Sequence, residues 1–489
     1  MDSSANLTAS AGDVPSIASF LSPQSIAVIG AAPAEQRSIR GMLLLVLRRA
    51  GFKGRIVPVN PSYREINGLP CYPAIGAVDF PVDLAMVALP ADMVCDIVEQ
   101  CAAAGIRAAI IISSGFAEES GDRAKLQTRL SQIARRTGIR ICGPNCEGFY
   151  NIVGGIAATF SAAAEPLESE RALPHASRRV AVVAQSGGLG FAILNRGRAL
   201  GLPFSHVVTT GNECDLTATD FIAHFAADAT TAVIIAYLEE IRDAASFAVA
   251  AELARTNGKA VIAIKIGRSE AGRRAALAHT ASDTGSAAEH SAMLARAGVI
   301  AVADPDEAVA MALSLTTSPV TAGRRVGIVT TAGGAGAVLG DCFTAAGFTV
   351  PALSEPLQAS LRPTFPAYGS AANPVDVTAQ GIFTGGILRT LQILIGCDEV
   401  DLIVLVVSLS SERSVSLDIE ALRALNARRS KPILIYSYTL PSPMAQASLS
   451  RVRIAMFAHV GDLLAAMRAL ARTDHPHAAV AIESELQAP

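Results

Sequence analysis

The sequence predicts an α/β protein of three consecutive modules, each built around a parallel sheet. Its 489 residues exceed what one hydrophobic core organises, and they suggest about three domains of ~150 residues. Three segments also begin alike, with a β-branched apolar run, a glycine-rich turn and a helical pattern. These segments are SIAVIGAAP from Ser25, RVAVVAQSGGLG from Arg179 and RVGIVTTAGGAG from Arg325. Their regular spacing agrees with the domain number that the length suggests.

Within the first module, short apolar strands alternate with amphipathic helical patterns. The expected strands are 26–30, 55–59, 84–88, 108–112 and 139–142, and the helical patterns include 92–104 and 122–136. Strands separated by helices imply right-handed crossovers and a parallel sheet. The strands are nearly continuous Val, Ile, Ala and Leu, which is typical of strands covered on both faces.

Polar, proline-containing segments divide the chain. We expect a flexible arm at 1–18, modules at 19–160, 176–318 and 323–473, and a tail at 474–489.

Composition and charge exclude several classes of protein. The formal net charge of −3 provides no basic field for a phosphate backbone, so we expect no nucleic-acid partner. No apolar run approaches the ~18 residues of a membrane span, and the first residues lack the features of a signal peptide. Eight scattered cysteines without a CxxC pair or a histidine cluster indicate reduced thiols, a cytoplasmic location and no metal site.

The first strand-to-helix turn contains Gly30, Ala31 and Ala32 but no GxGxxG sequence. Ligands of open α/β sheets bind at such turns, yet the missing fingerprint argues against an NAD-dependent enzyme. Arg37 and Arg40 follow the turn. Either could pair with a phosphate, and either could be an ordinary solvated side chain.

The second and third turns are more informative. The second contains Gln185, Ser186, Gly187 and Gly188, and the third contains Gly333 and Gly334. Consecutive glycines at a helix start leave backbone N–H groups free beside the positive end of the helix dipole, which suits a phosphoryl group. Glycine-rich turns of this kind also arise simply to pack a helix on a strand.

A long polar segment follows the strand expected at 261–266 and precedes a helix expected from about Ser286. We expect this segment to be a loop, and loops of this length are commonly functional. It contains His279, whose imidazole could attack phosphorus if a carboxylate oriented its other ring nitrogen. Glu239 and Glu240, directly after the strand AVIIAYL, are candidates for that carboxylate. By residue type alone, His279 could equally be a solvated loop residue and the glutamates a surface helix start.

The ordered set of these segments resembles the α-subunit of NDP-forming acyl-CoA synthetases, the family of ADP-forming acetate–CoA ligase and a relative of succinyl-CoA synthetase. The resemblance covers most of the chain. Its segments include GFKGRIVPVNP, PVDLAMVALPA, GIRAAIIISSGFAE, GIRICGPNCEG, VAVVAQSGGLG, AVIIAYLEEI, KIGRSEAGRRAALAHT, RVGIVTTAGGAG and NPVDVT.

The resemblance implies a CoA-binding Rossmann-like domain followed by two flavodoxin-like ligase domains. His279 falls on the phosphorylated histidine, and Glu239 or Glu240 on the residue that holds it, with the family spacing favouring Glu239. The turns at Gln185–Gly188 and Gly333–Gly334 fall on the phosphoryl cradle. The positions that line CoA correspond to Gly30, Ala31, Ala32, Arg40, Val59, Asn60, Leu89, Pro90, Ser113, Ser114, Gly115 and Asn145.

The activity implied by the resemblance is reversible synthesis of acyl-CoA from a small carboxylic acid. Acyl-CoA and phosphate give an acyl phosphate and CoA, and phospho-His279 then carries the phosphoryl group to a nucleoside diphosphate. The sequence contains no GxxxxGK[ST] motif. We therefore expect ATP or ADP and Mg²⁺ to bind mainly on a separate ATP-grasp β-subunit, within a dimer or an α₂β₂ hetero-oligomer.

Three positions depart from the family pattern. Ala281 stands where a glycine is usual, Asp283 adds negative charge near the histidine, and Arg40 replaces a glycine before the first helix. These departures keep an alternative open, a catalytically impaired subunit or regulator that binds CoA or acyl-CoA.

Overall fold

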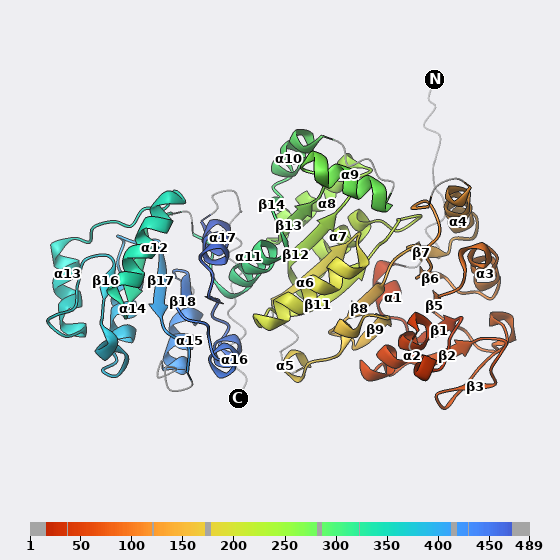
Figure 1. The fold of residues 1–489 in the computed structure, drawn as a ribbon, viewed down its shortest axis with the longest axis horizontal. Coiled ribbons are helices and arrows are strands. Elements are labelled where there is room, and N and C mark those ends of the chain that lie inside the picture. Colours follow the sequence, from red (N-terminus) through yellow and green to blue (C-terminus); the bar gives the residue numbers. More distant parts are fainter. Residues whose placement is uncertain are drawn as a thin grey trace, which may run out of the picture.

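The computed structural model describes residues 16–36, 38–119, 122–171, 178–280, 286–321, 323–411, 418–428 and 430–471. Three α/β modules follow one another in a row, each with a central sheet covered by helices (Figure 1). The expected tail and the first fifteen residues of the expected arm lie outside the described residues. The module boundaries themselves stay a prediction.

The first module contains a five-stranded parallel sheet in the order β2-β1-β5-β6-β7. All five predicted strands and both predicted helical patterns are present. The strands are β1 (Ser25–Ile29), β2 (Arg55–Val59), β5 (Leu84–Val87), β6 (Ala108–Ile111) and β7 (Arg140–Cys142), and β3 (Glu65–Ile66) and β4 (Leu69–Pro70) form a small hairpin. The helices are α1 (Ile17–Leu21), α2 (Ile39–Arg49), α3 (Ala91–Ala103) and α4 (Arg123–Thr137).

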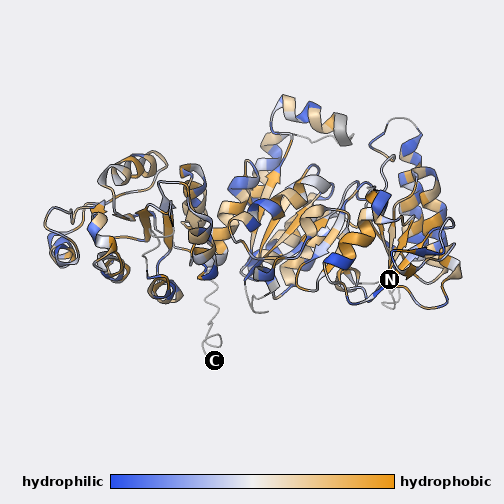
Figure 2. Ribbon diagram, turned by 60° about the horizontal axis from the view of Figure 1, so that its bottom comes forward, coloured by the Kyte–Doolittle hydropathy of each residue, from blue (hydrophilic) through white to orange (hydrophobic). Residues whose placement is uncertain are grey.

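Continuous apolar strands explain why this sheet is covered on both faces. Every residue of β1, β5 and β6 is buried. Helices are apolar on one side only, so α2 buries Leu43, Leu44 and Leu47 while its arginines remain outside. Figure 2 shows the same division throughout the molecule, with hydrophobic strands inside and hydrophilic residues on the outer helices.

The second module has a seven-stranded sheet in the order β14-β13-β12-β10-β11-β8-β9. Its parallel strands are β10 (Arg179–Ala184), β11 (Phe204–Thr209), β12 (Thr231–Leu238), β13 (Ala260–Lys265) and β14 (Ile300–Val302). Its helices are α5 (Glu168–Arg171), α6 (Gly187–Ala199), α7 (Ala218–Ala227), α8 (Ala244–Thr256), α9 (Glu270–Thr280), α10 (Ala287–Arg296) and α11 (Pro305–Thr317).

A hairpin extends this second sheet beyond the predicted parallel strands. β8 (Gly148–Asn151) pairs antiparallel with β11, and β9 (Ile156–Thr159) pairs antiparallel with β8. Asn151 closes the turn by accepting a 2.8 Å hydrogen bond from the Gly154 N–H. By hydrogen bonding, residues 148–159 therefore belong with the second module, whereas the sequence prediction assigns them to the first.

The polar segment expected to be a loop after β13 is helical over Glu270–Thr280, so that expectation was wrong. Four alanines in this segment have high helix propensity. The Ser269 hydroxyl accepts from Gly272 N–H at 3.0 Å, and Arg274 pairs with Glu270 one turn earlier at 2.8 Å. The following helix, α10, begins at Ala287 behind its N-cap Ser286, as predicted.

The third module has a five-stranded parallel sheet in the order β16-β15-β17-β18-β19. Its strands are β15 (Val326–Thr330), β16 (Val375–Asp376), β17 (Leu402–Val407), β18 (Ile433–Ser437) and β19 (Met456–Phe457). Its helices are α12 (Gly333–Ala345), α13 (Glu355–Leu361), α14 (Gly386–Gly396), α15 (Ile419–Ala427), α16 (Pro443–Arg451) and α17 (Val460–Leu470). α11 of the second module packs along α17, and this joins the two modules (Figure 1).

The described part of the chain has neither cystine bridges nor a helix suited to span a membrane. All eight cysteines are free thiols. Among the described helices, none combines the length and the apolar character needed to cross a membrane.

A buried ion pair ties the segment between the first two modules to α6. Arg198 donates to Glu170 through Nε at 2.8 Å and through Nη2 at 2.6 Å, and through Nη1 to the Ala163 carbonyl at 2.6 Å. The two side chains are only 10% and 6% exposed.

We expect Glu170→Gln to lower the free energy of unfolding by about 3 kcal/mol, because it leaves the Arg198 guanidinium buried without its counter-charge. Urea unfolding measures this loss. Glu165→Gln is the matched control, since its pair with Arg49 is more than half exposed and such pairs contribute about 0.5 kcal/mol or less. Equal losses of stability in the two variants would contradict a special contribution of the buried Arg198–Glu170 pair.

Candidate functional site

The second glycine-rich turn leads from β10 directly into α6. Ser186 is the extended residue before this helix, and Gly187 and Gly188 form its start. The Ser186 side chain does not cap the helix, and the first N–H groups of a helix have no intrahelical partner. The turn therefore offers N–H donors and a hydroxyl at the positive end of the α6 dipole.

The side chain of Gln185 is directed to the neighbouring strand end rather than to this turn. Its Oε1 accepts from the backbone N–H groups of Glu239 and Glu240 at 2.5 and 2.9 Å, and its Nε2 donates to the Glu240 carbonyl at 2.9 Å. Gln185 was predicted to bind phosphate. The structure instead places its side chain as a clamp on the segment that follows β12.

Lys265, at the end of β13, holds the same segment from the other side. Its ammonium donates to the Glu239 carbonyl at 2.7 Å and to the Ile266 carbonyl at 2.9 Å. Burial lowers the pKa of Lys265 to about 8, and the charges of Glu239 and Glu240 offset part of that effect. The backbone of Glu239 is thus fixed by side chains from both strands that flank β12.

Glu239 and Glu240 have different surroundings. The Glu239 side chain is buried, whereas Glu240 is partly exposed and pairs with Nε of Arg242 at 2.9 Å. Arg242 also donates to the carbonyls of Glu213 and Asn212 at 2.8 and 3.1 Å. One carboxylate of the predicted pair is therefore paired with an arginine, while its neighbour sits in the protein interior beside the clamp.

The predicted CoA positions lie at the carboxyl edge of the first sheet, in the turns after its five strands. Gly30 has φ +86°, and a Cβ there would lie 2.6 Å from the Ala88 carbonyl oxygen, so only glycine fits this turn. Asn60 donates to the Ala31 carbonyl at 2.8 Å, and the Ser113 hydroxyl accepts from Leu89 N–H at 3.1 Å. Of the other predicted positions, Val59 is the last residue of β2 and Arg40 lies in the first turn of α2. The remaining ones in these turns are Ala32, Pro90, Ser114, Gly115 and Asn145.

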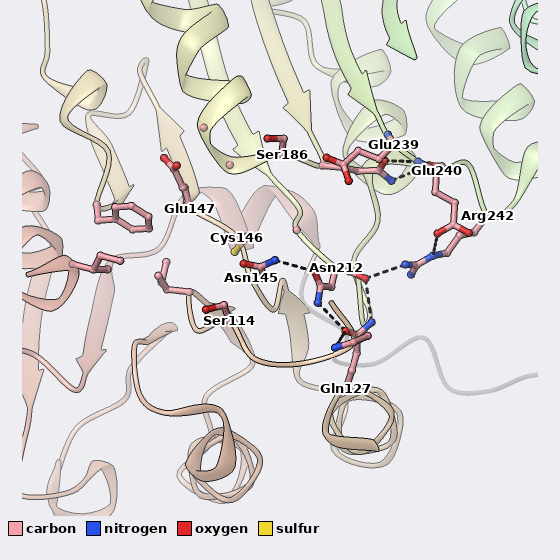
Figure 3. A pocket seen from close by; sticks show the side chains of 18 residues that line it. Ser114, Gln127, Asn145, Cys146, Glu147, Ser186, Asn212, Glu239, Glu240 and Arg242 are labelled. Carbon is pink, nitrogen blue, oxygen red and sulfur yellow. Dashed lines mark hydrogen bonds and ion pairs between the residues drawn. The ribbon is translucent and has the colours of Figure 1, made fainter. Parts of the chain in front are cut away.

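A cavity of about 310 Å³ opens between the first two modules (Figure 3). On the side of the first module it is lined by Ile39, Ile112, Ser114, Ala117, Gln127, Asn145, Cys146 and Glu147. On the side of the second it is lined by Phe160, Gln185, Ser186, Gly187, Gly188, Gly211, Asn212, Glu239, Glu240 and Arg242. The cavity thus brings the α6 turn and both candidate glutamates together with two of the predicted CoA positions.

A hydrogen-bond network closes the cavity between the modules. Asn145 donates to Asn212 Oδ1 at 3.3 Å, and Asn212 donates to Gln127 Oε1 at 3.0 Å. Figure 3 shows these two asparagines between Ser186 and the glutamates on one side and Ser114 and Gln127 on the other. The network fixes the floor of the cavity across the module boundary.

Two of the predicted phosphate-binding residues are not among those that line this cavity. Gly333 and Gly334 begin α12 of the third module, as predicted, but they do not line it. His279 lies in the last turn of α9. Residues 281–285, which include Ala281 and Asp283, and also Arg37, lie outside the described residues.

Sequence reasoning missed several residues of the site. Arg242 and Lys265 were missed although both stand at or just after the ends of predicted strands. Glu147 was missed although it directly follows Cys146 in the quoted segment GIRICGPNCEG. The available signal was position near the end of a strand, with Lys265 at the end of one and Arg242 and Glu147 a few residues after one. The described residues contain no group of three or more His, Cys, Asp or Glu side chains that could hold a metal ion.

Comparison with protein-family models finds one match in each of the three modules. Residues 24–151 match a CoA binding domain, residues 177–315 a succinyl-CoA ligase-like flavodoxin domain, and residues 326–395 a ligase-CoA domain.

Curated relatives match most of the chain. The α-subunit of the ADP-forming acetate–CoA ligase I of Pyrococcus furiosus is 34% identical over 368 residues, which cover 74% of this chain and 77% of that subunit. The ADP-forming acetate–CoA ligase I of Archaeoglobus fulgidus is 33% identical over 409 residues, which cover 83% of this chain and 57% of that protein. The chain therefore spans little more than half the length of the latter relative.

A solved structure has the same three-module arrangement. The acetyl-coenzyme A synthetase 1 of Ca. Korarchaeum cryptofilum, in complex with phosphate and ADP, aligns with a TM-score of 0.79 and 29% identity. The alignment covers 93% of this chain and 96% of that chain.

We expect Gln185→Leu to lower the free energy of unfolding by about 2 to 4 kcal/mol, because the N–H groups of Glu239 and Glu240 lose their acceptor. Urea unfolding of the full chain measures the loss. The control is Ser186→Ala, in which the altered side chain caps no helix. A Gln185→Leu chain as stable as that control would show that the clamp contributes nothing.

Lys265 gives a prediction for the pH dependence of stability. Its pKa is about 8 in the folded chain and about 10.4 when unfolded. Between these values the unfolded chain binds more protons, so raising the pH stabilises the wild type relative to Lys265→Met. We expect the difference in unfolding free energy to change by about 1 to 3 kcal/mol between about pH 7 and about pH 10 in urea titrations. A difference independent of pH would contradict this.

Proposed function

The chain belongs to the family of ADP-forming acetate–CoA ligases and their α-subunits. From this we propose that it is the α-subunit of an acid–CoA ligase. Such an enzyme interconverts acyl-CoA and nucleoside triphosphate through an acyl phosphate. The cavity between the first two modules carries the proposal. There the edge of the CoA-binding module faces the α6 turn and the buried Glu239.

The first half-reaction would take place in this cavity. CoA would lie along the turns of the first sheet, with its thioester near Ser114 and Asn145. Phosphate at the α6 turn attacks the thioester carbonyl, the C–S bond breaks, and acyl phosphate and CoA result. N–H groups fixed at a helix start stabilise the phosphoryl oxygens without reorganisation.

His279 would perform the second half-reaction. A ring nitrogen attacks the phosphorus of the acyl phosphate, the carboxylate leaves, and the phosphohistidine then transfers the phosphoryl group to a nucleoside diphosphate. A carboxylate that accepts a hydrogen bond from the other ring nitrogen orients the imidazole. We assign this part to Glu239, because Glu240 is paired with Arg242 while the backbone of Glu239 is clamped from two sides.

The nucleotide and Mg²⁺ would bind mainly on a partner. Relatives named as α-subunits support a separate second subunit, and we propose that it is an ATP-grasp β-subunit in a dimer or α₂β₂ assembly. Gly333 and Gly334 at the start of α12 would offer a second set of N–H donors during transfer to the nucleotide. The acid is a small carboxylic acid.

The test is phosphorylation of the purified chain with its partner, [γ-³²P]ATP and Mg²⁺. We expect acid-labile, base-stable label that disappears in His279→Ala. His290→Ala is the matched control, because this histidine lies on the next helix, α10, and should leave labelling unchanged.

Label that persists in His279→Ala would refute the role of this histidine. The alternative, an impaired CoA-binding subunit or regulator, predicts CoA binding by calorimetry together with no label in any chain.

A further inference from the structure

Glu147 lies in the wall of the cavity beside the start of α6. Its backbone N–H donates to the Thr209 hydroxyl at 2.9 Å, and that hydroxyl donates to the Gly148 carbonyl at 2.9 Å. Thr209 ends β11, so a neighbouring strand fixes the position of the Glu147 backbone. Figure 3 shows Glu147 towards the start of α6 and away from Gln127.

The Glu147 side chain is packed against the two glycines that open the helix. A Cβ on Gly187 would lie 2.6 Å from Glu147 Cγ and 3.2 Å from its Oε1, and a Cβ on Gly188 would lie 3.9 Å from the same oxygen. Any side chain at position 187 would collide with this glutamate. The carboxylate is thus a close neighbour of the N–H groups that the proposed function assigns to the phosphoryl group.

The charges around Glu147 leave it without a strong cationic partner. None of the ion pairs among the described residues includes Glu147, and the arginine that lines the cavity, Arg242, is paired with Glu240. The other acidic groups that face the cavity are Glu239 and Glu240. Burial raises the pKa of the Glu147 carboxyl, and a hydrogen bond from Ser161 offsets part of that rise.

A carboxylate beside a helix start is stabilised by the helix dipole, which also attracts phosphate. The two anions repel each other when both are present, because like charges a few ångströms apart in a partly buried site interact strongly. The site therefore binds a phosphoryl group more tightly when Glu147 is neutralised or turned away.

We propose that Glu147 gates the phosphoryl site: its carboxylate stabilises the start of α6 when no phosphate is bound, and it weakens the binding of phosphate until it is protonated or displaced. This inference rests on the proposed function, which places the phosphoryl group at the α6 turn. Glu147 then sets how tightly, and at which pH, that turn holds its anion.

The experiment measures binding of inorganic phosphate to the full chain by calorimetry at constant ionic strength, at about pH 6 and about pH 8.5. We expect Glu147→Gln to bind phosphate about tenfold more tightly than wild type at the higher pH. The ratio of the two dissociation constants should fall as the pH is lowered towards the pKa of this carboxyl, which burial raises above its ordinary value. A parallel titration with sulfate, whose charge is the same at both pH values, separates the titration of Glu147 from that of phosphate.

Glu252→Gln on α8 is the matched control, since it removes one exposed carboxylate far along the chain from the α6 turn, and it should bind phosphate as wild type does. Glu147→Ala serves as a second variant and should also bind more tightly. Equal affinities of wild type and both Glu147 variants, or weaker binding by Glu147→Gln, would overturn the gate.

The outcome is separable from that of the proposed function. If no chain binds phosphate, the gate is wrong even where His279 becomes labelled. If Glu147→Gln tightens phosphate binding while His279 takes no label, the anion site and its gate stand and the phosphotransfer is wrong.

Discussion

The backbone of Glu239 is held by side chains from both neighbouring strands, and the rest of the site depends on this constraint. On the β10 side, Gln185 accepts a hydrogen bond from the Glu239 N–H. On the β13 side, Lys265 donates a hydrogen bond to the Glu239 carbonyl. Gln185 is also the residue immediately before the α6 turn. The position of the buried carboxylate and the position of the N–H donors are therefore fixed by one side chain. The proposed alignment of a histidine, a carboxylate and a phosphoryl group would require this kind of preorganisation.

The electrostatics of the cavity follow from that arrangement. Three carboxylates, from Glu147, Glu239 and Glu240, and one guanidinium, from Arg242, line a space that would receive phosphate and CoA. Side-chain charge alone would repel these anions. In the proposed function the attraction comes from backbone dipoles at the start of α6, which do not titrate. The positive end of the α6 dipole can thus lie beside glutamates that would bind a proton or orient an imidazole.

Sequence reasoning predicted the three modules, the strands of the first sheet and the turns that build the cavity, because strand burial and glycine-rich turns leave direct patterns. It did not predict the hairpin of residues 148–159, because antiparallel addition to a distant strand, β11, depends on the tertiary fold. It expected a loop where α9 forms, because the segment is polar and has few large apolar residues. Alanines and a serine cap nevertheless favour a helix there. The hydrogen bonds of the Gln185 side chain to the segment after β12 were also not predicted, since the direction of a side chain cannot be read from residue spacing.

The carboxylates beside the two glycine-rich turns differ in how firmly their side chains are held. Asp376 occupies at α12 the place that Glu147 occupies at α6, since a Cβ on Gly333 would lie 2.9 Å from Asp376 Oδ2. Asp376 also accepts a 2.8 Å hydrogen bond from Thr378 N–H, a short-range turn that fixes its carboxylate. Glu147 has a longer side chain and a hydrogen bond from the Ser161 hydroxyl, which can rotate to a new acceptor at small cost. A carboxylate therefore lies beside a helix start in both modules. In the third module a backbone hydrogen bond fixes Asp376, whereas in the second module, where the cavity lies, the Glu147 side chain can change its position.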